Sequence, residues 1–212
     1  MKKALIVGNG EEADKRIIEN IQYDYVICAD GGLDKAKNYG IIPDSIIGDF
    51  DSVDVLLLKQ YEEYNIPIIK FPSEKDYTDM ELAIEFAVSK GYDSLVLTGA
   101  TGTRADHTMG NIMLMEKYYY MGVNITIIDN NNEIRVISDN TDLFIDFRED
   151  FYISIIPVDD IIQGLNLEGF KYNLDNVNVE RGSTLCISNQ IAAENGRITL
   201  RKGTAILFIS KD

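Results

Sequence analysis

Short apolar runs separated by amphipathic segments fill the first 130 residues of the chain. The runs are rich in Val and Ile and nearly continuous rather than alternating, which is typical of strands buried on both faces of a parallel sheet. They occupy residues 4–7, 25–29, 45–47, 66–71, 94–98 and 124–128. Because helical segments separate these runs, the pattern predicts a doubly wound α/β domain with a mostly parallel sheet.

The helical pattern is clearest over residues 78–90. Thr78 and Glu81 have the spacing of a capping box, and apolar residues follow at helical intervals. Lys90 and Gly91 provide a stop signal. Further helices are expected at residues 11–20, 33–39, 55–64 and 108–121.

The pattern changes after Asp129. Asn130-Asn131-Asn132 predicts a turn, and the segments beyond it are short and β-like without a long helical period. Strands are expected at residues 133–138, 143–147, 152–158, 185–188, 197–201 and 205–210. We therefore expect an α/β domain over residues 1–131 and an antiparallel β-sandwich domain over residues 132–212.

Composition adds information mainly through charge. The 212 residues include 35 acidic and 20 basic side chains, for a net charge of −15. This balance disfavours a nucleic-acid partner, because binding phosphates requires clustered Lys and Arg, and it is compatible with a cationic ligand or a divalent metal. Cys28 and Cys186 lie in apolar stretches, as buried thiols do. No apolar run is long enough for a signal peptide or a membrane span, so we expect a cytoplasmic protein without membrane association.

Glycine, aspartate or both follow five of the apolar runs, where an open parallel sheet binds its ligands. Any one of these Asp residues is explained equally well as a helix cap or turn former. Five strand ends of this kind at one sheet edge favour a ligand site instead. The segments are Gly8-Asn9-Gly10, Asp30-Gly31-Gly32, and residues 48–52, 75–79 and 98–107.

Three of these carboxylates suggest a metal. Asp49 and Asp51 are two residues apart, so they point the same way if the chain is extended. Like charges on one face repel unless a cation lies between them, and Mg²⁺ prefers such oxygen ligands together with substrate phosphates. Asp79 is a candidate third ligand, although an acidic residue in a first helical turn also complements the helix dipole.

The segment over residues 99–106 has the features of a phosphate site. Its glycines allow backbone to approach an anion, and the helix after it presents free N–H groups. Arg104 is suited to grip phosphate oxygens or to pair with a nearby Asp, and Lys75 would add a second positive charge. Asp106 is suited either to a role in the site or to capping the helix. His107, the sole histidine, is suited either to a role in the site or to packing.

A dinucleotide-binding fingerprint competes with this interpretation. Gly8-x-Gly10-x-x-Ala13 has the required spacing, and Asp30 stands where the ribose-binding acid is expected. Glu11 and Glu12 would, however, oppose the pyrophosphate. We therefore disfavour dinucleotide binding.

Taken in order, the motifs resemble those of the thiamine pyrophosphokinase (thiamine diphosphokinase) family. The resemblance implies an ATP-binding α/β domain followed by a β-sandwich, in a homodimer with thiamine bound where subunits meet. It also implies Mg²⁺-dependent transfer of the terminal pyrophosphate of ATP to thiamine, with release of AMP. The matching motifs are Asp30-Gly31-Gly32, Pro43-Asp44, Gly48-Asp49-Phe50-Asp51-Ser52, Lys75-Asp76-x-Thr78-Asp79, Gly102-x-Arg104-x-Asp106-His107, Gly169-Phe170-Lys171-Tyr172-x-Leu174 and Ser188-Asn189.

The residue pattern and the resemblance together assign roles to the candidates. Asp49, Asp51 and Asp79 are expected to hold Mg²⁺. Asp76, Asp79 and Asp106 are the catalytic candidates, and either Asp76 or Asp106 would accept the hydroxyl proton. The expected ATP-binding residues are Asp30, Gly31, Gly32, Lys75, Gly99, Gly102, Arg104 and His107; by resemblance, the thiamine-binding residues are Tyr172, Ser188 and Asn189.

Two other functions remain open from the residues. A phosphohydrolase would use Asp49 as a covalent nucleophile, because Asp-x-Asp after an apolar strand also suits that chemistry. A non-catalytic module would bind nucleotide and dock a partner through its β domain. The three hypotheses differ in whether AMP and thiamine diphosphate are formed.

Overall fold

The chain forms two units in the computed structural model, which describes residues 2–51, 55–72, 74 and 76–212. The first unit spans Met1–Asn130 and the second Asn131–Asp212. The division falls within the asparagine run at which the sequence pattern changes. The two units are described in turn.

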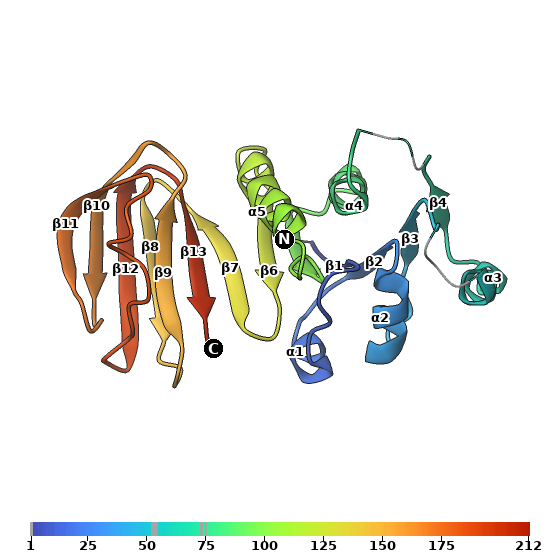
Figure 1. The fold of residues 1–212 in the computed structure, drawn as a ribbon, viewed down its shortest axis with the longest axis horizontal. Coiled ribbons are helices and arrows are strands. Elements are labelled where there is room, and N and C mark those ends of the chain that lie inside the picture. The colour runs from blue at the N-terminus through green and yellow to red at the C-terminus, as the bar shows by residue number, and fades with distance from the viewer. Residues whose placement is uncertain (1, 52–54, 73, 75) are drawn as a thin grey trace. The chain divides into compact units, whose positions relative to one another are not determined.

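The first unit is a parallel sheet covered by helices (Figure 1). Its strands lie in the order β4-β3-β2-β1-β5-β6, with every neighbouring pair parallel. The strands are β1 (Lys3–Val7), β2 (Tyr25–Ala29), β3 (Ser45–Gly48), β4 (Ile68–Lys70), β5 (Ser94–Thr98) and β6 (Asn124–Ile128). The helices are α1 (Lys15–Glu19), α2 (Gly32–Tyr39), α3 (Val55–Glu63), α4 (Asp79–Ser89) and α5 (Ala105–Tyr119).

The strand order reverses at β1. The chain first builds the sheet outward from β1 to β4, then returns to place β5 on the other side of β1. As a result, α1, α2 and α3 lie on one face of the sheet and α4 and α5 on the other (Figure 1). This confirms the expected doubly wound fold and creates a switch point between the carboxyl ends of β1 and β5, where such folds bind ligands.

Continuous apolar strands are explained by burial on both faces. Leu5 and Ile6 of β1 are neighbours in sequence and point to opposite faces, yet both are fully buried. Helix α4 contributes its expected stripe, in which Ala83, Ile84 and Ala87 are fully buried. The sheet is therefore rigid support for the loops at its carboxyl edge.

Two helix starts differ from the sequence expectation. The segment over residues 11–20 becomes helical only at Lys15, because the amide of Glu11 bonds to the neighbouring loop and Asp14 caps the helix through the amide of Arg16. The helix expected from residue 108 already begins at Ala105, so that Asp106 and His107 lie in its first turn.

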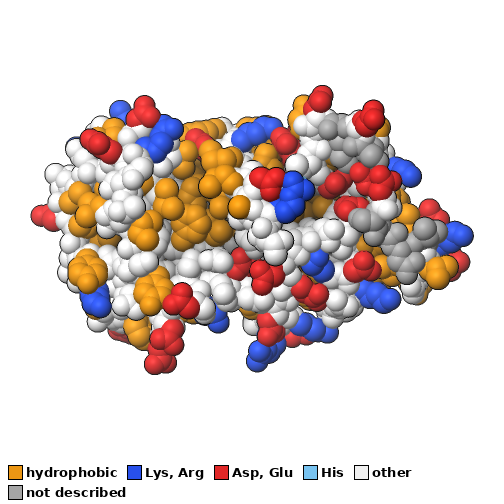
Figure 2. All heavy atoms as spheres, in the orientation of Figure 1, with side chains coloured by type: hydrophobic (Ala, Val, Ile, Leu, Met, Phe, Trp, Pro, Cys, Tyr) orange, Lys and Arg blue, Asp and Glu red, His pale blue; other side chains and the backbone are white. Residues whose placement is uncertain are grey.

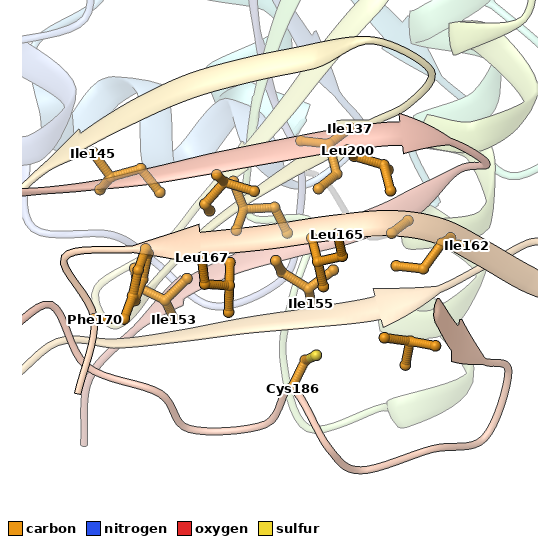
Figure 3. Packing of buried hydrophobic residues seen from close by; sticks show 14 of the residues in the cluster. Ile137, Ile145, Ile153, Ile155, Ile162, Leu165, Leu167, Phe170, Cys186 and Leu200 are labelled. Carbon is orange, nitrogen blue, oxygen red and sulfur yellow. The ribbon is translucent and has the colours of Figure 1, made fainter. Parts of the chain in front are cut away.

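The second unit is an antiparallel β-sandwich, as expected. One sheet has the order β7-β13-β9 and the other β11-β10-β12-β8. Ile153 and Ile155 of β9 pack against Leu165 and Leu167 of β10 between the sheets (Figure 3). The strands are β7 (Asn132–Ile137), β8 (Thr141–Asp146), β9 (Tyr152–Pro157), β10 (Ile161–Glu168), β11 (Leu174–Glu180), β12 (Asn195–Lys202) and β13 (Ala205–Ser210).

The strand expected at residues 185–188 is wrong. This segment is a turn in which only Cys186 enters the core, whereas Leu185 and Ile187 are exposed. The amide of Ile155 donates to the carbonyl of Cys186, and Ser188 adopts a φ of 58° that ends any extended run. Strands β10 and β11 were absent from the expected set.

Charged side chains of both signs are visible on one face of the molecule (Figure 2). On the face shown in Figure 2, Lys and Arg side chains lie among Asp and Glu side chains. Within the part of the chain that the structure describes, no helix has the length and apolarity needed to cross a bilayer.

Candidate functional site

A cleft of about 700 Å³ opens at the switch point of the first unit. Its walls come from the loops after β1 and β5, from the end of β2 and from the start of α4. Expected site residues that line it are Asp30, Asp79, Gly99, Gly102, Arg104 and His107. Lining residues that were not among the expected catalytic or binding residues include Gly8, Asn9, Gly10, Glu11, Thr78, Thr101, Thr108 and Asn111.

The loops after β1 and β5 form the floor of the cleft by direct backbone pairing. The amide of Gly10 donates to the carbonyl of Gly99, and the amide of Glu11 to that of Thr101, each at 2.7 Å. A Cβ on Gly10 would lie 2.1 Å from the Thr101 oxygen, and Gly99 has a φ of +62°. Only glycine allows this approach, which presents main chain rather than side chains to a ligand.

Helix α5 is tied to the same loop through polar side chains. Asn111, buried in the second turn of the helix, donates from Nδ2 to the carbonyl of Ala100 at 2.6 Å. Thr108 Oγ1 accepts from the amide of Gly102 at 3.2 Å. The sequence shows an amphipathic helix here but gives no sign of these bonds, because each partner lies on the preceding loop.

Arg104 lies at the mouth of the cleft and is paired with Asp106. Its Nη2 and Nε lie 2.6 and 3.2 Å from the two carboxylate oxygens. The guanidinium lowers the pKa of Asp106, and the carboxylate raises the pKa of Arg104. Both side chains are well exposed, so solvent screens the ion pair and weakens it. A phosphate would therefore be able to compete with Asp106 for the Arg104 guanidinium.

Three acidic residues line the cleft together with this arginine, namely Glu11 in the loop after β1, Asp30 and Asp79. Asp79 stands in the first turn of α4, whose cap is Thr78 accepting from the amide of Glu81 at 3.2 Å. The capping expectation is confirmed for this bond, while the Glu81 carboxylate accepts from Lys117 of α5 at 2.7 Å. Asp30 follows β2 with a φ of 45°, and its amide donates to β3.

Asp49 and Asp51 form a turn rather than the extended pair expected from their spacing. Asp49 Oδ1 accepts from the amide of Asp51 at 3.1 Å, and Phe50 between them has a φ of 64°. Phe50 packs its ring against the core of the first unit, which compensates the strained backbone. Neither carboxylate lines the cleft.

The described residues do not include a preassembled group of three metal-ligating side chains. Asp49, Asp51 and Asp79 therefore do not form such a group in this structure. The donor set nonetheless fits Mg²⁺, because every candidate is a carboxylate oxygen. A Cβ on Gly48 would meet the backbone of Asp30 at 3.1 Å, so the end of β3 lies beside a carboxylate that does line the cleft.

Four further described candidates of the first unit do not line the cleft: Gly31, Gly32, Asp76 and Asp106. Gly31 caps α2 and Gly32 begins it, with Gly32 packed closely on the backbone of Val7. Asp76 is exposed before α4. Lys75 lies outside the described residues.

In the second unit, the structure brings two of the three thiamine candidates into contact. Asn189 is buried, and its amide group donates to the carbonyl of Tyr172 at 2.7 Å and accepts from its N–H at 3.1 Å. Tyr172 is exposed, and the amide of Ser188 donates to Ser154 Oγ. Asn189 thus fixes the backbone that carries Tyr172.

Comparison with known proteins decides the family. A model described as "Thiamin pyrophosphokinase, catalytic domain" matches residues 18–127, and one described as "Thiamin pyrophosphokinase, vitamin B1 binding domain" matches residues 133–205. A thiamine pyrophosphokinase of Bacillus subtilis is 37% identical over 189 residues, which cover 88% of this chain and 87% of that protein. The chain belongs to the thiamine pyrophosphokinase family.

Solved structures agree with this membership. The crystal structure of thiamine pyrophosphokinase from Bacillus subtilis matches all of both chains with a TM-score of 0.90 at 34% identity. The Geobacillus thermodenitrificans thiamin pyrophosphokinase gives a TM-score of 0.84 at 32% identity, over 99% of this chain and 98% of that one. The resemblance and fold inferred from the motifs are confirmed. The loop over residues 8–11, which lines the cleft, lies outside both family-matched spans.

Proposed function

We propose that this member of the thiamine pyrophosphokinase family transfers pyrophosphate from ATP to the hydroxyl of thiamine, giving thiamine diphosphate and AMP. The observation that carries the proposal is the cleft at the switch point. It combines glycine backbone, the start of α5, an arginine and three acidic residues, Glu11, Asp30 and Asp79, in one cavity. Backbone N–H groups and Arg104 suit the polyphosphate, while carboxylates suit a cation that accompanies it.

ATP binding is assigned to the residues at the cleft. The loop over residues 99–102 cradles the phosphates, and Arg104 exchanges its Asp106 partner for phosphate oxygens. Asp30 and His107 complete the site, and Gly31 and Gly32 shape the turn beneath it. Lys75 is proposed as a second phosphate-binding cation. Transfer then depends on positioning ATP so that AMP leaves in line with the attacking hydroxyl.

Mg²⁺ is assigned to Asp49, Asp51 and Asp79. When bound, the metal would neutralise charge on the phosphates. To bind it, Asp49 and Asp51 would leave their present turn, and Asp79 would contribute from the first turn of α4. Asp76 or Asp106 accepts the hydroxyl proton of thiamine, and Asp106 becomes free to do so once Arg104 turns to phosphate.

Thiamine binding is assigned to Tyr172, Ser188 and Asn189 of the second unit, in a homodimer. Asn189 contributes mainly by holding the backbone of Tyr172, with which it makes two hydrogen bonds. The dimer is tested by the mass of the protein in solution at micromolar concentration. A monomeric mass would contradict it.

One assay separates the three functions considered. The protein is incubated with Mg-ATP and thiamine, and the products are analysed for AMP and thiamine diphosphate. Equal amounts of both support the proposal. Release of inorganic phosphate from monoesters without thiamine would indicate the phosphohydrolase, and ATP binding without AMP formation would indicate the non-catalytic module.

Matched variants test the metal and phosphate roles. Asp49→Asn and Asp51→Asn are expected to lower turnover and raise the Mg²⁺ requirement, whereas Asp175→Asn, an exposed acid in β11, leaves both unchanged. Full turnover with an unchanged Mg²⁺ requirement in both variants would exclude the metal assignment.

Arg104 is tested separately. Arg104→Ala is expected to raise the KM for ATP. Arg181→Ala removes another exposed Arg–Asp pair, with Asp160, and serves as the control. Unchanged KM and turnover in Arg104→Ala would remove its phosphate role.

A further inference from the structure

Asp129 and Asn130 follow β6, and neither lines the cleft. Both nevertheless bond to the loops that do. Residues 128–132 also fall between the two spans matched by the family models, which end at residue 127 and resume at residue 133.

Asp129 holds the loop after β5. Its side chain is buried, and Oδ2 accepts from Thr101 Oγ1 at 2.7 Å. Thr101 is the residue whose carbonyl accepts from the amide of Glu11 in the neighbouring loop. A hydrogen bond from a hydroxyl to a buried carboxylate is strong, because one partner is charged and little water competes.

Asn130 holds the loop after β1. Its Oδ1 accepts from the amide of Asp14 at 2.6 Å, and its Nδ2 donates to the carbonyl of Glu12 at 3.1 Å. The amide of Asp14 and the carbonyl of Glu12 both belong to the turn before α1, where backbone groups have no partner within the helix. Adjacent side chains after β6 thus tie down both loops that form the floor of the cleft.

We propose that Asp129 and Asn130 are positioning residues that brace the two glycine loops in the geometry that binds the polyphosphate of ATP. The brace rests on the proposed function, since the ligand is taken to be a nucleotide. Asp129 and Asn130 hold the main chain of the two loops, and that main chain contacts the ligand. The two side chains themselves do not contact it. Loss of the brace weakens nucleotide binding, while the chemistry after binding is unaffected.

Four variants, two of them controls, test the brace by nucleotide affinity. Asn130→Ala removes both bonds to the first loop, and Thr101→Val removes the hydroxyl donor to Asp129 with almost no change of shape. Each is expected to raise the dissociation constant of a non-hydrolysable ATP analogue with Mg²⁺ about tenfold, the effect of losing one or two such bonds. Thr101→Ser keeps the donor and restores affinity. Asn124→Ala makes the same side-chain change at the opposite, exposed end of β6 and leaves affinity unchanged.

Steady-state kinetics distinguish positioning from a general structural defect. The KM for ATP is expected to follow the dissociation constant, while kcat and the KM for thiamine stay within about twofold. Equal losses in all three parameters, or wild-type affinity in both Asn130→Ala and Thr101→Val, would overturn the brace.

Amide hydrogen exchange of the free protein gives a readout that needs no nucleotide. The amides of Gly10 and Glu11 are expected to exchange faster in Asn130→Ala and Thr101→Val, and that of Ile6 in β1 to remain protected. Unchanged exchange at Gly10 and Glu11 overturns the brace. Wild-type protein that binds no nucleotide contradicts the proposed function instead, and the exchange experiment still decides the brace.

Discussion

Gly99→Ala is the sharpest test of how the cleft is built. Gly99 adopts a φ of +62°, and its carbonyl accepts the amide of Gly10. An added Cβ would lie 2.2 Å from the carbonyl oxygen of Gly8, where ordinary contact begins at 3.4 Å. The two loops must therefore separate, and the bond between Gly10 and Gly99 is the first to be lost.

The cost has two parts. A non-glycine residue in the left-handed region costs about 1–2 kcal/mol. Forcing packed backbone apart adds about 1–3 kcal/mol, so a loss of about 3 kcal/mol in the free energy of unfolding is expected. Gly122→Ala isolates the first part, because Gly122 has a φ of +82° and an added Cβ there meets nothing within 4 Å.

Urea denaturation of both variants, with ATP binding measured in parallel, provides the assay. Gly122→Ala is expected to lose about 1 kcal/mol and to bind ATP normally. Gly99→Ala is expected to lose about three times as much stability and most of its ATP affinity. Equal destabilisation of the two variants would refute the close-approach argument, and normal ATP affinity in Gly99→Ala would refute the role of this loop in binding.

Three further substitutions test local features of the two units. Thr78→Ala removes the cap of α4 and should lower the free energy of unfolding by about 1 kcal/mol in urea denaturation, with Thr78→Ser close to wild type. Arg104→Ala should raise the pKa of Asp106 in an NMR titration toward its ordinary value. In the wild type that ion pair persists at neutral pH and is lost only as pH falls through the lowered pKa. Leu165→Ala in the sandwich core should cost about 2–5 kcal/mol, against less than about 0.5 kcal/mol for exposed Leu185→Ala.

The sequence predicted the parallel sheet well, because its strands are buried on both faces and read as unbroken apolar runs. It failed for β10 and β11, where the signal is interrupted. Gly164 in β10 has a φ of +68°, and the pairing of the two strands shifts register on either side of Leu165. Strand β11 is largely exposed and polar. Irregular pairing of this kind breaks the period-two alternation on which strand prediction depends.

The candidate site shows the same division between what is local in sequence and what is not. Spacing identified carboxylates and the arginine, since each follows an apolar run. It misjudged Asp49 and Asp51, because the strained φ of Phe50 is fixed by packing of its ring in the core. It places Gly8 and Gly10 at the ligand-binding edge of the sheet but does not include either among the ATP-binding residues.

The bonds that shape the cleft explain this difference. Thr101 reaches Asp129 across 28 positions, and Asn130 reaches Glu12 across 118. Neither pair has a periodic or compositional signal, because their partners meet only after the parallel sheet has brought the carboxyl ends of β1, β5 and β6 together. Side chains that act on a ligand directly are thus visible as motifs at strand ends. Side chains that act by holding the backbone can be identified only from the structure, by assigning a partner to each backbone hydrogen-bonding group of the loops.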